Sequence, residues 1–143
     1  MGTDAAPLKQ TILQSGLCKQ VQASLDEEMR DIPYLLIFRG GKPEEGEALE
    51  RLVLKRLEEI AQEGIPHHLV EGAIHQLEFD RLEISGGGYP YGLQLFFRSI
   101  LLQQHGGNSE EGLQVHKLFK QLRERCQDPA YLSTLLRLSL IHI

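Results

Sequence analysis

Apolar and polar positions follow two different periods along the chain, and each change of period marks a new element. Apolar residues recur every three or four positions from Pro7 to Ser15, which predicts a short helix ended by Gly16. The segment from Cys18 to Leu25 alternates residue by residue instead, which predicts a strand with one buried face. Tyr34 to Phe38 is apolar throughout, which predicts a central strand covered on both faces. The polar stretch between the two strands predicts a hairpin connection.

After Lys42 the pattern is helical. The expected helices run from Pro43 to Glu63, from Pro66 to about Ile84, from Tyr91 to His105, from a cap at Ser109 onward, and from Asp128-Pro129 to about Leu140. The helix from Tyr91 to His105 is apolar on most sides, so we expect it to be the central buried helix. About six helices and two strands predict an α+β fold that is mostly helical.

The second predicted strand is so apolar that we expect it to have neighbours on both sides, but the sequence predicts only one other strand. A two-stranded ribbon is marginally stable alone, and Tyr34 to Phe38 is too apolar for an exposed edge. We therefore expect a single incomplete domain, in which residues 1–64 form a helix–strand–strand–helix part and residues 65–143 a helical part. The isolated chain is expected to self-associate, by edge pairing or exchanged helices, or to aggregate.

Composition narrows the class of protein. The chain has 143 residues, of which 41% are hydrophobic and 24% charged, so it fits one globular domain and not a disordered segment. Its net charge of −5 and its lack of a basic run predict no nucleic-acid partner. No apolar stretch reaches the roughly 18 residues of a membrane span, and no signal peptide is visible, so no membrane partner is expected. Two distant cysteines, Cys18 and Cys126, favour a reducing compartment such as the cytoplasm or an organelle matrix.

One group of residues has the types that bind zinc. At about 100° per residue His68, Glu71 and His75 share a helix face, which Glu78 extends. One inverted zinc motif reads His-x-x-Glu-His, but Gly72 stands where the second histidine is needed. We therefore predict a solvated polar face and no metal site, with His68, Glu71 and His75 as the alternative ligand set.

Aromatic residues around a glycine run are the other candidate site. The run Ser85-Gly-Gly-Gly lacks the following lysine of a phosphate loop, so it predicts a flexible connection. Tyr89 and Tyr91 beside it could line a peptide groove, with Arg98 as a further lining candidate. The alternative is that the tyrosines cover the loop while Phe96 and Phe97 pack in the core. No residue is predicted to be catalytic.

Four segments of the chain have distinctive sequences. They are Leu36-Ile-Phe-Arg-Gly-Gly, Glu71 to Phe79 with Gln-Leu-Glu-Phe at its end, Tyr89-Pro-Tyr-Gly-Leu and His105-Gly-Gly. Together they resemble the presequence-protease branch of the pitrilysin/insulinase family of zinc metallopeptidases. Their order and spacing match, and the resemblance covers residues 7 to about 136.

The resemblance implies a part of a larger enzyme. Such enzymes have four related α+β domains, in two halves that close around a peptide chamber, and they hydrolyse short unstructured peptides with zinc-activated water. The matched region is the second, non-catalytic domain of the first half, so a partial pitrilysin-type fold is implied. The family's His-x-x-Glu-His motif lies outside the match, so zinc would belong to the parent enzyme, and this chain alone is expected to bind no cofactor and to be inactive.

The partners that the resemblance implies are the remaining domains of the parent peptidase and its peptide substrates. The chain would then help to build the wall of the substrate chamber. Two other readings stay open. One is a stand-alone helical module that binds peptides or a protein, and the other is a small metal-binding protein that uses the histidine face.

Overall fold

The computed structural model describes residues 6–26, 29, 32–82 and 90–140. These residues form six α-helices, two short 3₁₀ helices and one two-stranded sheet, which confirms the expected α+β fold with mostly helical content. The chain divides into two compact units. Unit 1 comprises residues 1–69 and 129–143, and unit 2 comprises residues 70–128. No described helix has both the length and the apolar character to cross a lipid bilayer.

Unit 1 contains the two predicted strands together with three of the predicted helices. Its elements are α1 (Pro7–Gln14), β1 (Gln20–Leu25), β2 (Tyr34–Arg39), the 3₁₀ helix η1 (Pro43–Glu45), α2 (Gly46–Glu63) and α6 (Tyr131–Leu140). Pro7 occupies the first turn of α1, where a missing N–H costs nothing. Gly64 ends α2 with φ of 83°, a conformation that glycine adopts without strain, and its N–H donates to the Ile60 carbonyl.

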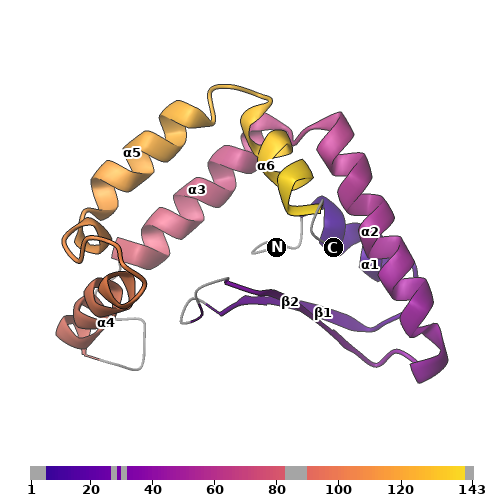
Figure 1. Ribbon diagram of the computed structural model, residues 1–143. Coiled ribbons are helices and arrows are strands. Elements are labelled where there is room, and N and C mark those ends of the chain that lie inside the picture. Colours follow the sequence, from indigo (N-terminus) through magenta and orange to yellow (C-terminus); the bar gives the residue numbers. More distant parts are fainter. Residues whose placement is uncertain (1–5, 27–28, 30–31, 83–89, 141–143) are drawn as a thin grey trace. The chain divides into compact units, whose positions relative to one another are not determined.

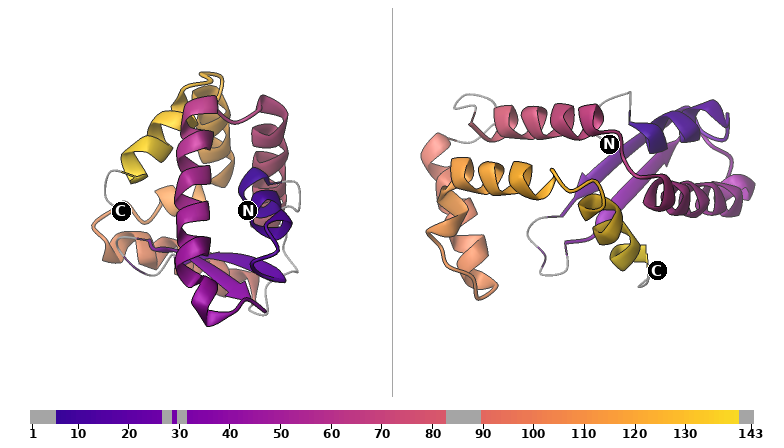
Figure 2. Two further views of the ribbon diagram at one scale, coloured as in Figure 1. Left: turned by 90° about the vertical axis from the view of Figure 1, so that its right-hand side faces the viewer. Right: turned by 90° about the horizontal axis from the view of Figure 1, so that it is seen from above.

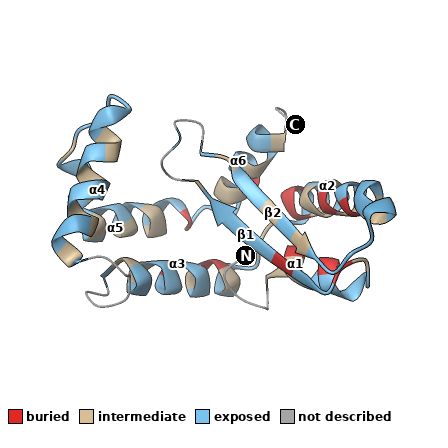
Figure 3. Ribbon diagram, turned by 90° about the horizontal axis from the view of Figure 1, so that it is seen from below, coloured by how far each residue is buried: buried red, intermediate tan, exposed pale blue. Residues whose placement is uncertain are grey.

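The two strands form an antiparallel hairpin. Val21 pairs with Phe38 and Ala23 with Leu36 on the face toward the core, while Gln22 pairs with Ile37 on the outer face. The expectation that β2 is covered on both faces is wrong, because Leu35 is 48% and Ile37 43% exposed. Among the described residues the hairpin is the whole sheet, and unit 1 supplies helices to one face of it only. The outer face is in the foreground of Figure 3 and is exposed along most of its length.

The core of unit 1 lies between the hairpin and its helices. Its buried members are Leu8, Ile12, Cys18, Val21, Leu49, Val53 and Ile60. They come from α1, the start of the hairpin and α2, and both helices lie over the same face of the hairpin (Figures 1 and 2). Helix α2 therefore contributes Leu49, Val53 and Ile60 to this core.

The last helix packs on α2. The Arg137 Nε donates a hydrogen bond to the Ala61 carbonyl oxygen over 3.1 Å, and Leu136 packs against the core of unit 1. Helix α6 begins at Tyr131, two residues after the predicted start at Pro129. The last helix thus belongs with the N-terminal elements, and the expectation of one incomplete domain stays a prediction.

Unit 2 carries three helices among its described residues. Helix α3 (His67–Leu82) enters it from unit 1, and α4 (Tyr91–Gln104), the 3₁₀ helix η2 (Glu111–Leu113) and α5 (Val115–Arg125) follow. The N-cap position of η2 is Glu110 and not the predicted Ser109, and no side chain caps this helix. The Glu110 N–H donates to Asn108 Oδ1 over 3.0 Å.

Helix α4 is not the buried centre that its composition predicted. None of its residues is buried, and Phe96 and Phe97 are 56% and 44% exposed. Apolar residues on most sides of a helix allow each of those sides to be buried, but a side is buried only where another element packs against it. In unit 2 the 3₁₀ helix η2 packs against α4, and its Gly112 lies so close that an added Cβ would stand 2.7 Å from the Arg98 carbonyl oxygen.

Candidate functional site

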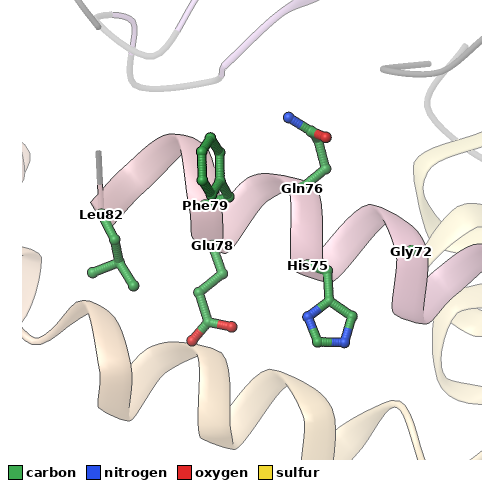
Figure 4. Close-up of a pocket in the computed structure, with 6 residues that line it drawn as sticks. All are labelled: Gly72, His75, Gln76, Glu78, Phe79 and Leu82. Carbon is green, nitrogen blue, oxygen red and sulfur yellow. The ribbon is translucent and has the colours of Figure 1, made fainter. Parts of the chain in front are cut away.

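The polar face of α3 is directed at α5. Glu78 accepts a hydrogen bond of 2.6 Å from the Arg123 Nη2, and Arg123 Nε lies 3.9 Å from the Glu71 carboxylate. The Nδ1 of His75 is 3.5 Å from Arg123 Nη2. Glu78 and His75 extend from the same side of α3 (Figure 4). One arginine therefore joins three residues that the sequence places at helical spacing on another element.

Charge determines the state of this cluster. The hydrogen bond from Arg123 lowers the pKa of the Glu78 carboxyl, against a smaller opposing effect of desolvation. The nearby His116 and His75 lower that pKa further. Glu78 in turn raises the pKa of the Arg123 guanidinium. Glu78 is thus held ionised, so the pair serves as a clamp between α3 and α5 and not as a proton donor.

These positions do not fit a metal ion. His68 is exposed, while Glu71 and His75 lie beside the positive charge of Arg123. Zinc needs several ligands within about 2 Å of one point, and a guanidinium there would repel it. Over the residues that the structure describes, no group of three or more His, Cys, Asp or Glu side chains could hold a metal. The polar face is also less solvated than predicted, because Glu71 and Glu78 are half-buried.

The other candidate residues occupy α4 and the segment before it. Tyr89 lies outside the described residues, and Tyr91 is half-buried at the start of α4. Arg98 Nη2 donates to the Arg81 carbonyl oxygen over 3.1 Å, so it ties α4 to the last turn of α3. The Phe96 and Phe97 rings have centroids 6.0 Å apart, and both are exposed, so the expected core role of this pair is wrong.

A shallow open depression lies along the surface of α3. Its volume is about 510 Å³, and it is lined by Gly72, His75, Gln76, Glu78, Phe79 and Leu82 (Figure 4). All lining residues come from one helix, so the depression lacks the converging walls of an enclosed active site. Phe79 stands exposed at it. The shape suits a surface contact better than the capture of a small substrate.

The two cysteines are free and buried. Burial raises the pKa of the Cys18 thiol, and burial together with Glu71 raises the pKa of the Cys126 thiol. A raised pKa keeps a thiol protonated and unreactive at neutral pH. Both side chains therefore act as small apolar groups.

Sequence comparison relates the chain to longer proteins. It is 29% identical over 126 residues to presequence protease 1, chloroplastic/mitochondrial, of Arabidopsis thaliana, and this match covers 87% of the chain. It is 24% identical over 119 residues to protein HypA of Clostridium perfringens, a match that covers 83% of the chain. In both cases the chain spans 12% of the relative's length. No protein-family profile matches it.

These matches support the resemblance that the sequence motifs indicated, at a coarser level. The chain is similar over most of its length to a segment of a presequence protease. The similarity thus points to a segment of a peptidase, and the geometry above describes what the residues of that segment do.

Proposed function

We propose that this chain is a non-catalytic domain segment of a zinc-dependent peptidase of the presequence-protease kind. The observation that carries the proposal is the match to presequence protease 1, which includes 87% of this chain but 12% of that enzyme. In the proposal the catalytic zinc is held elsewhere in the parent enzyme. The clamp of Arg123 on Glu78 and Glu71 supports this division, because it commits these two acidic residues of α3 to a structural contact.

The proposed role is to form part of a substrate chamber and to brace the catalytic domain. Two apolar surfaces support it. One is α4, with exposed Phe96 and Phe97, and the other is the outer face of the hairpin, with Leu35 and Ile37. Apolar patches of this kind are found where a protein meets another surface. The substrates would be short unstructured peptides, and the two free cysteines are compatible with a reducing compartment.

A segment exchange tests this proposal. The matched segment of the Arabidopsis presequence protease is replaced by the corresponding 126 residues of this chain, and cleavage of an unstructured peptide and zinc content are measured. A scaffold role predicts that the chimera binds zinc and retains cleavage. The matched control carries Ile12→Asp in the exchanged segment, which buries a charge in the core and should abolish folding.

The isolated chain gives the second arm. It should cleave no peptide with or without added zinc. Zinc-dependent cleavage by the isolated chain, lost in His68→Ala, would show that the chain carries its own catalytic metal. A chimera that folds and binds zinc but cleaves nothing would show that this chain cannot take the place of the segment.

A stand-alone interaction module is the second candidate, and the exposure of α4 favours it. This function predicts that the isolated chain binds a fluorescent amphipathic peptide in an anisotropy titration. Phe96→Ser should then weaken that binding by about tenfold or more, as expected for an aromatic anchor. If the chimera is active and the isolated chain binds no such peptide, the results favour the peptidase segment over the interaction module.

A further inference from the structure

Backbone hydrogen bonds at both ends of β2 show which of its residues face β1 and which face the free edge. The Asp26 N–H donates to the Pro33 carbonyl at 3.3 Å, and the Lys19 N–H donates to the Arg39 carbonyl at 2.9 Å. Residues 33 and 39 therefore direct their backbone groups at β1. Because this direction alternates along an antiparallel strand, Leu35 and Ile37 also bond to β1. The N–H and C=O groups of Tyr34, Leu36 and Phe38 then point away from the hairpin.

From Tyr34 to Phe38 this edge lacks the features that prevent strand pairing, and Pro33 and the charged Arg39 flank that stretch. Natural edge strands use charged residues, proline or a bulge to keep other strands away, but Tyr34 to Phe38 contains no charge and no proline. The opposite edge differs. Strand β1 has polar Gln20, Gln22 and Ser24 in alternation, and α1 packs beside it. The edge of β2 is therefore the more exposed to pairing.

The sequence of β2 is complementary to itself. When two copies pair antiparallel about a twofold axis at Leu36, every outward-facing amide and carbonyl from Tyr34 to Phe38 finds a partner. This register places Tyr34 opposite Phe38 of the other copy, an aromatic pair that stabilises sheets. It also places Leu35 opposite Ile37, side chains that are about half exposed in the single chain. No like charges meet across the axis.

We propose that β2 is a homodimerisation strand, and that two copies of this chain join their hairpins into one four-stranded antiparallel sheet centred on Leu36. In the dimer the edge of β2 gains a hydrogen-bonded neighbour, which an edge strand lacks in the single chain. The interface is isologous, since the same edge serves in both copies. This property does not depend on the proposed peptidase role.

The register gives a charge test on two positions. In the double variant Leu35→Lys/Ile37→Lys, lysines face lysines twice across the axis, and in Leu35→Glu/Ile37→Glu, glutamates face glutamates. Both positions lie on the exposed outer face, so the single chain should still fold, which far-UV circular dichroism checks. Mixed in equal amounts, the two variants place lysine opposite glutamate at each pair.

The measurement is sedimentation velocity over a range of chain concentrations. We expect the wild-type chain to shift from monomer to dimer as its concentration rises. The dimer dissociation constant of each charged variant should be at least about 30-fold higher than that of the wild-type chain. The mixture should regain the dimer as a one-to-one complex. The matched control is Gln22→Lys/Ser24→Lys, which puts the same charges on the same face of β1, one strand away from the axis, and should dimerise like wild type.

Several results would overturn the proposal. They are a wild-type chain that stays single at every concentration, aggregates without a defined mass, a lysine variant that dimerises like wild type, or a mixture that stays unpaired. If the wild-type chain stays single but binds a synthetic peptide of residues 33–40, the edge of β2 accepts a separate strand and is not a dimer interface.

Discussion

Truncation of Ile12 to alanine should lower the free energy of unfolding of unit 1 by about 2–5 kcal/mol. The Ile12 side chain is 0% exposed and lies in the cluster that joins α1, the hairpin and α2. The substitution removes three carbon groups, and at about 0.8 kcal/mol for each buried group the loss of transfer energy alone is about 2–3 kcal/mol. The cavity that remains adds the rest, because packed neighbours relax only in part.

Urea denaturation followed by far-UV circular dichroism measures this loss, and amide hydrogen exchange by mass spectrometry assigns it to a unit. Ile12→Val should cost about 0.5–1.5 kcal/mol, so the series is graded. The neighbouring Leu13 is 37% exposed, and Leu13→Ala should cost less than half as much as Ile12→Ala. Exchange should rise in α1 and α2 and stay constant in α5. Equal costs at both positions would refute the assignment of Ile12 to the core.

Three further outcomes are expected. Ile74→Ala, at a position 3% exposed, should cost about 2–5 kcal/mol in urea denaturation, whereas His68→Ala on the exposed side of the same helix should change stability by about 0.5 kcal/mol or less. Because Arg123 lowers the pKa of Glu78 in the folded chain, the stability from this pair is present above the ordinary carboxyl pKa of 4.5 and is lost as pH falls through the lower folded value. Glu78→Gln should therefore flatten the acid side of a plot of unfolding midpoint against pH, and an unchanged slope would contradict the clamp. Gly112→Ala would force η2 away from the α4 backbone and should cost about 1–3 kcal/mol, seen as faster amide exchange in α4.

Local pattern was sufficient for the elements themselves. The helix period from Pro43 to Glu63 predicted α2, which begins at Gly46 after the 3₁₀ helix η1 and ends at Glu63 as expected. Alternation from Cys18 to Leu25 predicted β1, which begins at Gln20. Its predicted buried face is buried only at Val21, and Leu25 at its end is 53% exposed. Such signals are reliable because each residue is judged against neighbours on its own element. Boundaries were weaker, as the late start of α6 shows.

Contacts between elements were beyond local pattern. Arg123 was not a candidate, although it pairs with Glu78, a residue 45 positions away. A single charged residue on an amphipathic helix has no periodic signal that names its partner. The exposure of α4 was missed for the same reason, because composition records apolar sides and does not record which neighbours the chain supplies. An arginine in the last turn of a helix, together with an acidic face on another helix, is the signal that could have been weighed.

The division of the chain into units also fixes an order of events during synthesis. Residues 70–128 are complete before α6 leaves the ribosome, whereas unit 1 needs α6 to cover α2. Domains generally fold as units while the chain is made. The inserted unit can therefore form its helices while the hairpin, α1 and α2 wait for their last partner. During that interval the surface of α2 around Ala61 that later receives Arg137 is open to chaperones and proteases, so the last helix to be made covers the part of unit 1 that was made first.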